Sequence, residues 1–117
     1  MTLSLVKSSD VIGMPLTGQE GRKLGTVREM YVDPAAGAVE FLIVEAASLL
    51  GGSGKYHPVP SRIVRYDSVD RSLQVDVAKD RFKESPSYDR EQLSGASYGW
   101  AEQAARFFAE SRASDQA

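Results

Sequence analysis

The segment Val39-Glu40-Phe41-Leu42-Ile43-Val44 decides how this chain folds. Successive side chains of a β-strand point to opposite faces, and in this segment apolar residues occupy both sets of positions. At the surface of a single sheet, such a strand would leave one apolar face in water. We therefore predict that this strand is covered on its outer side as well as on its inner side.

Further short β-patterned segments flank this strand and are separated by turns rich in glycine and proline. The six expected strands lie at residues 11–16, 24–32, 39–44, 55–59, 62–66 and 73–77. Turns at intervals of about 8–12 residues are typical of a barrel or sandwich and not of a βαβ fold. The sequence therefore predicts an all-β fold, a small barrel of about six strands. Pro58 and Pro60 restrict their segment to an edge, a bend or a strand end.

The segment from Leu24 to Val32 departs from strict alternation. Val27, Met30 and Val32 are the expected inward residues, and the step from 27 to 30 breaks the period of two. One extra residue near Arg28-Glu29, a β-bulge, would restore the register. The following residues, 33–37, are predicted to form a tight turn in which the Asp33 side chain bonds the backbone ahead.

After residue 77 the pattern changes, so that residues 1–88 form the expected barrel domain. Residues 79–84 fit a short helix that must end before Ser85-Pro86. Residues 89–98 are polar and are expected to be a linker, and 113–117 a frayed tail. Residues 99–112 predict an amphipathic helix with Glu102 and Arg106 paired on its polar face. Its apolar face carries Trp100, Ala104, Phe107, Phe108 and Ser111.

The aromatic helix is the expected cover of the two-sided strand. It can fold back on its own barrel, or reach a second copy through the linker, and the linker length does not choose between the two. A homodimer is favoured because the two-sided strand and the apolar loop residues offer more surface than one helix covers. The predicted interface residues are Phe41, Leu42, Ile43, Val44, Leu49, Leu50, Trp100, Phe107 and Phe108.

Composition restricts the function. The 117 residues carry a net charge of -2, which disfavours nucleic acid as a partner because a phosphate backbone is bound by basic surfaces. The absence of cysteine excludes disulfides and thiolate chemistry. No apolar run approaches the roughly 18–20 residues that cross a bilayer, and the first residues do not resemble a signal peptide. We therefore expect a cytoplasmic protein without membrane insertion.

Candidate chemistry is sparse. His57 is the single histidine and has no second histidine to share a metal with. Asp33, Glu29 and Glu45 could gather around a cation, although Asp33-Pro34 is more simply a turn. The glycine-rich stretch 51–55 lacks the second spacing of a phosphate loop and continues with Tyr56. We expect no catalytic residues, no cofactor and no metal.

One basic and aromatic group deserves comparison with RNA-binding barrels. It consists of Arg62, Arg65, Arg71 and Tyr66. Acidic residues at 67, 70 and 76 are interleaved with it, which favours a mixed-charge solvated face over an RNA site.

The order and spacing of several short motifs resemble the PRC-barrel domain over about residues 9–88. The motifs are 10–16 (DVIGMPL), 21–27 (GRKLGTV), Val32-Asp33-Pro34, the 39–44 strand, Gly51-Gly52 with Lys55-Tyr56, Val59-Pro60, and Phe82 with Ser85-Pro86. The chain is also similar to the cytoplasmic domain of the photosynthetic reaction centre H subunit and to the C-terminal half of a ribosome maturation factor. The resemblance implies a compact β-barrel without catalytic machinery, used for contacts with proteins.

Three functions follow from these observations. The leading one is a non-enzymatic interaction or assembly module that is homodimeric and docks a partner protein. The second, implied by the resemblance alone, is association with RNA or the ribosome. The third is a small-ligand barrel or enzyme, which would need an enclosed pocket containing His57 and a carboxylate.

Overall fold

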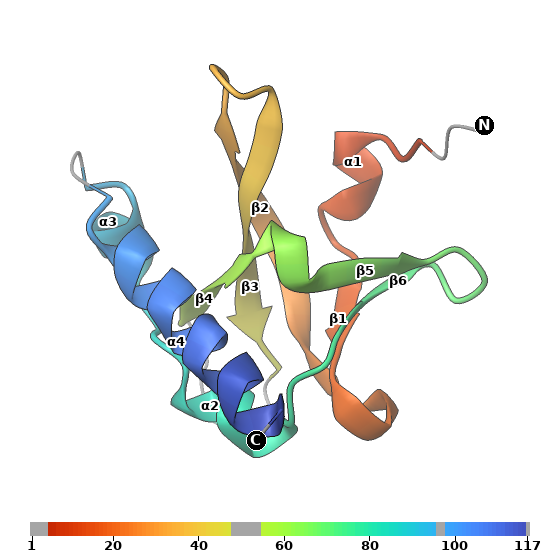
Figure 1. The fold of residues 1–117 in the computed structure, drawn as a ribbon. Helices are drawn as coiled ribbons and strands as arrows, with labels where there is room; N and C mark the ends of the chain where they lie inside the picture. Colours follow the sequence, from red (N-terminus) through yellow and green to blue (C-terminus); the bar gives the residue numbers. More distant parts are fainter. Residues whose placement is uncertain (1–4, 48–54, 96–97, 117) are drawn as a thin grey trace.

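The computed structural model describes residues 5–47, 55–95 and 98–116 of the chain. Its strands are β1 (Pro15–Thr17), β2 (Lys23–Asp33), β3 (Ala38–Ala46), β4 (Tyr56–Pro60), β5 (Val64–Asp67) and β6 (Ser72–Val75). They form one six-stranded sheet in the order β4-β3-β2-β1-β6-β5 (Figure 1). The prediction of a mostly β fold with six strands and a C-terminal helix is therefore confirmed.

Hydrogen bonds do not close the sheet into a complete barrel. Within the described ranges, β4 pairs with β3 alone among the strands and β5 with β6 alone. The 3₁₀ turn η3 (Ser61–Ile63) joins these two end strands directly. The end position of β4 agrees with the restriction expected from Pro58 and Pro60. β1 and β6 form a parallel pair, Leu16 beside Leu73 and Thr17 beside Gln74, which the sequence pattern did not predict.

The helical segments differ from the sequence prediction near both ends of the chain and between α2 and α4. The model has α1 (Ser8–Val11), η1 (Gln19–Gly21), α2 (Lys79–Glu84), α3 (Arg90–Leu93) and α4 (Trp100–Gln116). The expected strand at 11–16 is wrong in its first half, because Val11 ends α1 and Gly13, at φ 98°, turns the chain before β1. The expected frayed tail is helical through Gln116, since no glycine or proline follows Gly99 to end α4.

The segment 89–98 contains more structure than a linker. Asp89 and Gln92 form a reciprocal capping box at the start of α3, in which the Asp89 carboxylate accepts from the Gln92 backbone N–H at 2.8 Å. The last residue of α3, Leu93, is buried. Within the described residues 89–95, α3 therefore packs against the sheet through Leu93, beside the start of α4.

The β2–β3 hairpin contains the predicted bulge. The register passes from Val27 opposite Val44 to Glu29 opposite Ile43, so that Arg28 is the extra residue. In the turn, the Asp33 carboxylate accepts from the backbone N–H groups of residues 35 and 36 at 3.0 and 3.3 Å. Val27 is buried and residue 30 half-buried as expected, whereas Val32 is 56% exposed because the hairpin extends beyond the core.

Two apolar clusters cover the two faces of β3. Leu42 and Val44 belong to the main core. Ile43 points to the other face and packs in a second cluster with residues of β4, α3 and α4. The prediction that this strand is covered on both sides is confirmed. The main core is made of Met14, Leu16, Leu24, Val27, Leu42, Val44, Ala46, Val59, Leu73, Val75, Val77, Phe82 and Phe108.

Gly25 provides a test of the tight β2–β3 contact. A Cβ atom at this position would lie 2.2 Å from the Glu45 carbonyl oxygen and 2.7 Å from Val44 Cγ1. Because backbone cannot give way as a flexible side chain does, we expect Gly25→Ala to lower the free energy of unfolding by about 1–3 kcal/mol or more. Gly99→Ala is the matched control, since a Cβ there meets nothing within 4 Å. Urea unfolding measures both, and equal stability of the two variants would refute the close approach.

Candidate interaction surfaces

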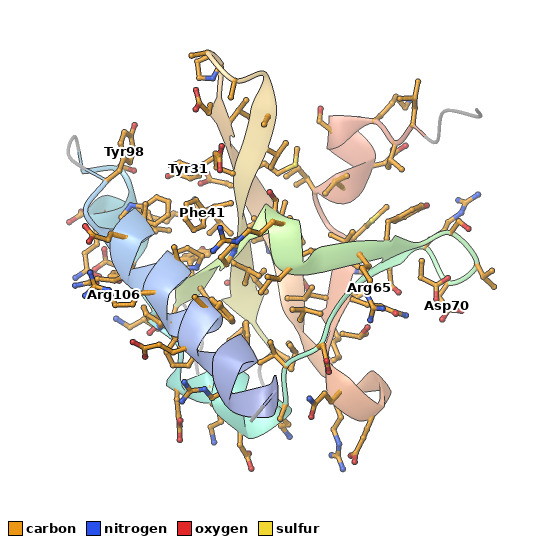
Figure 2. The ribbon with its side chains drawn as sticks, viewed as in Figure 1. Tyr31, Phe41, Arg65, Asp70, Tyr98 and Arg106 are labelled. Atoms are coloured by element: carbon orange, nitrogen blue, oxygen red, sulfur yellow. The ribbon has the colours of Figure 1, made fainter. Side chains whose placement is uncertain are left out.

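Trp100, the first residue of α4, is the centre of the second cluster. Its ring lies edge-on to Tyr31 and Phe41, with centroid distances of 5.0 and 5.3 Å. Its Nε1–H donates to the Leu93 carbonyl oxygen at 3.1 Å, so that the buried indole nitrogen has a partner. Tyr98 joins the group at the start of the helix, 5.8 Å from Tyr31 (Figure 2).

The remaining aromatic residues of α4 extend this contact along β4 and α2. Phe108 is buried in the main core, and Phe107 packs against its border. The Arg81 guanidinium of α2 lies 4.1 Å from the centroid of the Phe107 ring. On the opposite side of α4, Arg106 donates to Glu102 at 2.8 Å, which confirms the predicted pair. The helix is therefore amphipathic as expected, and it docks on its own sheet.

The predicted interface residues thus lie mostly inside one chain. Phe41, Ile43 and Trp100 meet in the second cluster. Three others, Leu42, Val44 and Phe108, are part of the main core, and Phe107 borders it. Leu49 and Leu50 lie outside the described residues. Among the described residues, α3 and α4 cover the outer face of β3 at Ile43, so the strand face on which the homodimer argument partly rested is already packed within one chain.

His57 is buried and has a structural environment. Its Nδ1 lies 2.8 Å from Ser85 Oγ, and its ring centroid is 4.6 Å from that of Phe82. The Ser85 hydroxyl donates to the Phe82 carbonyl oxygen at 2.6 Å, so its oxygen is free to accept the Nδ1 proton of a neutral imidazole. Burial lowers the pKa of His57 to about 4. The side chain links β4 to the end of α2.

Two of the three candidate cation ligands, Asp33 and Glu45, are engaged elsewhere. Asp33 caps its own turn. Glu45 accepts from Arg28 at 2.9 Å. Among the described residues, no group of three histidine, aspartate or glutamate side chains could hold a metal ion.

The arginine and tyrosine group lies at the far end of the sheet. Arg65 is exposed on β5 (Figure 2). Tyr66 is exposed on the same strand, and Arg71 is exposed in the turn to β6. Asp67 accepts from the backbone N–H groups of residues 69 and 70 and so belongs to the turn.

In the part of the chain that the structure describes, no helix is long and apolar enough to cross a membrane.

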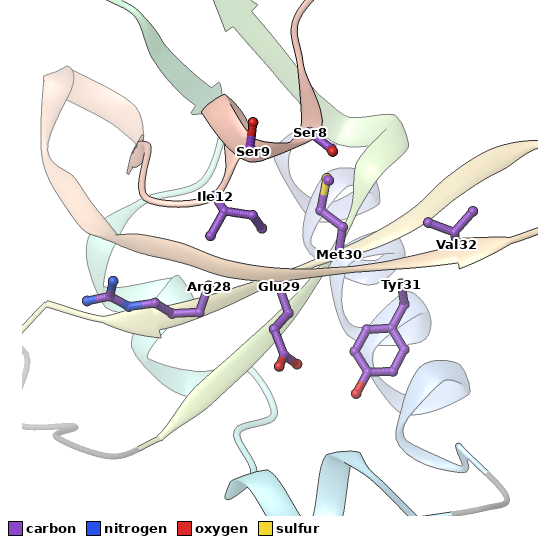
Figure 3. A pocket seen from close by; sticks show the side chains of 8 residues that line it. All are labelled: Ser8, Ser9, Ile12, Arg28, Glu29, Met30, Tyr31 and Val32. Carbon is purple, nitrogen blue, oxygen red and sulfur yellow. The ribbon is translucent and has the colours of Figure 1, made fainter.

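The outer half of β2 forms a groove that the sequence did not predict. β1 pairs with β2 only as far as Thr26, and backbone bonds between residue 27 and residues 13 and 14 end this contact. Beyond that point α1 stands beside β2 without pairing to it (Figure 3). The space between them has a volume of about 670 Å³ and is lined by Ser8, Ser9, Ile12, Arg28, Glu29, Met30, Tyr31 and Val32.

A short β1 beside a long β2 is the signal that could have revealed this groove. Pro15 begins β1, and Gly13 prevents the chain from continuing as a strand toward the hairpin tip. Ile12 and Val32 are exposed apolar residues at this place. The candidate surface is therefore an open sheet edge with apolar walls.

These features define a small, mostly β domain with exposed residues on β5 and an open groove along the outer half of β2. The PRC-barrel domain model matches residues 4–82, which is more than half of the chain. The chain belongs to the PRC-barrel family. The match ends within α2, so that α3 and α4 follow the family domain. A search of curated proteins found no match.

Replacing Trp100 tests the docking of α4. We expect Trp100→Ala to lower the free energy of unfolding by about 3–5 kcal/mol, because it opens a cavity between β3, α3 and α4. Arg106→Ala on the exposed side of the same helix is the control and should change stability by less than about 0.5 kcal/mol. Chemical unfolding followed by circular dichroism measures both. A Trp100→Ala protein as stable as the control would contradict the packed helix.

His57 predicts a specific acid sensitivity. Its pKa is lowered to about 4 in the folded chain from 6.5, so the fold favours the neutral ring. As pH falls, the unfolded chain therefore binds more protons than the folded chain. The contribution of His57 to the free energy of unfolding is complete above pH 6.5 and is lost toward pH 4. We expect wild type to lose about 3 kcal/mol more than His57→Gln across this range. The measurement is the free energy of unfolding of both proteins at each pH. An equal loss in the two proteins would exclude a lowered pKa of His57.

Proposed function

We propose that this PRC-barrel protein is a non-enzymatic interaction module that acts as a homodimer and docks a further protein. Membership of the family supports a small interaction or assembly domain. One observation carries the proposal. On the side of β2 away from β3, no strand of the described chain pairs with β2 beyond Val27, so this edge is open. Unpaired N–H and C=O groups at a sheet edge bind an added strand, which is a common mode of protein recognition.

The titratable side chains favour a binding role over catalysis. A general base needs access to substrate and a pKa near the working pH. His57 is buried, neutral and bonded to Ser85, and it lies on β4, away from the β2 groove. The groove holds Ser8 and Ser9, the ion-paired Arg28 and the carboxylate of Glu29. Glu29 points to the side of β2 opposite to the two serines (Figure 3), so these described residues form no aligned nucleophile and base pair.

RNA association has weaker support. The chain carries a net charge of -2, and Asp67 and Asp70 accompany the exposed arginines of β5 and its turn. Phosphate binding depends on a local excess of positive charge. A protein surface, with its mixture of backbone, apolar and charged groups, matches the β2 edge better.

Sedimentation over a wide range of protein concentration tests the homodimer. The monomer has a mass of 12.7 kDa, and we expect a reversible shift to twice this mass as concentration rises. If the dimer forms through the open edge of β2, Val32→Glu should weaken dimerisation, because it places a charge on the exposed apolar edge. Val69→Glu, at the 90% exposed position of the β5–β6 turn, is the matched control and should dimerise as wild type does. A single 12.7 kDa species at every concentration would refute the homodimer.

A further inference from the structure

We propose that the groove beside β2 receives Leu5-Val6-Lys7 of a second copy as an added antiparallel strand, and that the two copies exchange these segments reciprocally. The inference rests on the proposed homodimer and specifies its contact. It follows from two exposed features of the same chain that fit one another: an unpaired strand edge with an apolar wall, and a segment before α1 that exposes the apolar residues Leu5 and Val6.

The groove offers what a strand needs. β3 occupies one side of β2 up to Asp33, and on the other side no strand of the described chain is paired beyond Val27. Met30 points toward α1, on the same side of the strand as Ser8 and Ile12, whereas Glu29 and Tyr31 point to the opposite side (Figure 3). An added strand would therefore meet an apolar wall on one face and a charged and aromatic one on the other.

The segment before α1 has the shape and composition of such a strand. Leu5 is 85% exposed and Val6 38%, although both are apolar. Lys7 has extended backbone angles, φ -68° and ψ 142°. The chain enters α1 from the side away from the β2–β3 hairpin (Figure 1), so this segment does not lie in its own groove.

One antiparallel register matches every position. With Val6 opposite Met30, Lys7 lies opposite Glu29 and Leu5 opposite Tyr31. Val6 then faces the apolar wall, while Leu5 and Lys7 face the other side, as strand alternation requires. A parallel register would instead place Leu5 beside the carboxylate of Glu29.

The charges at this place are complementary. Arg28 is paired with Glu45 at 2.9 Å, which leaves its neighbour Glu29 as the acidic group of the groove. Neither Glu29 nor Lys7 forms an ion pair within the ranges that the structure describes. A Lys7 from a second copy would supply the missing partner. Because the exchange is reciprocal, each such pair occurs twice.

The proposed contact is small, so the dimer that it forms is expected to be weak. A stable complex typically buries about 1,600 Å² in total. Three residues in a groove of about 670 Å³, counted twice, make a modest interface. We therefore expect a reversible dimer that forms at high concentration and is sensitive to single substitutions in the groove.

Cysteine cross-linking between copies tests the register, since the natural chain has no cysteine. Lys7→Cys and Glu29→Cys are prepared as separate full-length proteins, one with a size tag, mixed and mildly oxidised. We expect a mixed disulfide between the two variants as the main product, because directly opposed residues in an antiparallel pair are close enough to join. Lys7→Cys mixed with Val69→Cys is the control and should give only background cross-linking, since Val69 lies in the β5–β6 turn.

Three outcomes would overturn the inference. A dimer in sedimentation without the mixed disulfide would reject this contact and leave the homodimer standing. A monomer at every concentration would reject both. An intramolecular disulfide in dilute Lys7→Cys/Glu29→Cys would show that the segment reaches its own groove. Each single-cysteine protein is checked by circular dichroism, so that a folding defect is recognised before cross-linking.

Charge reversal gives an independent readout of the same contact. Lys7→Glu and Glu29→Lys should each weaken dimerisation several-fold, because each places like charges opposite one another. The double variant Lys7→Glu/Glu29→Lys restores the opposite-sign pair between copies and should recover the wild-type dissociation constant. Additive weakening in the double variant would contradict the pairing of these two residues.

Discussion

The whole structure depends on the need to cover β3 on both faces. Leu42 and Val44 are buried on one face, and Ile43 on the other, so neither face can remain in water. Burying each such side chain contributes roughly 1.5–3 kcal/mol, a large share of the stability of a small domain. A curved sheet covers one face only. The second face requires an element that the sheet itself does not contain.

α3 and α4 supply that element from outside the matched family domain. The Leu93 carbonyl at the end of α3 accepts from Trp100 Nε1 at 3.1 Å and from the Tyr31 hydroxyl at 3.4 Å. One backbone oxygen thus joins the C-terminal segment to the β2–β3 hairpin. The capping box at Asp89 determines where α3 begins and hence where this oxygen lies. The covering helix is therefore positioned by a specific polar contact as well as by apolar packing.

The sequence predicted the elements whose causes are local. The Arg28 bulge follows from broken alternation, the Asp33 turn from its side chain, and the C-terminal helix, expected at 99–112, from apolar periodicity. It did not predict the parallel pairing of Leu16 with Leu73, because these residues are distant in sequence and alternation does not specify the partner. The short helix α3 was missed since only one of its four residues, Leu93, is apolar and buried.

The sequence did not predict the β2 groove, because alternation does not show where the pairing of one strand with its neighbour ends. The location of the groove follows from what α4 covers. With α4 packed on β4, the sheet retains two open edges among the described residues, at β5 and along the outer half of β2. β5 is four residues long and alternates charged Arg65 and Asp67 with its other side chains, features that discourage strand pairing. β2 instead presents Met30 and Val32 beside Ile12, the apolar residue that follows α1. The same stretch of β2 also carries Arg28 and Glu29, but Arg28 is paired with Glu45. Because this edge extends beyond its neighbour β1 and includes exposed apolar residues, the fold leaves it available for pairing.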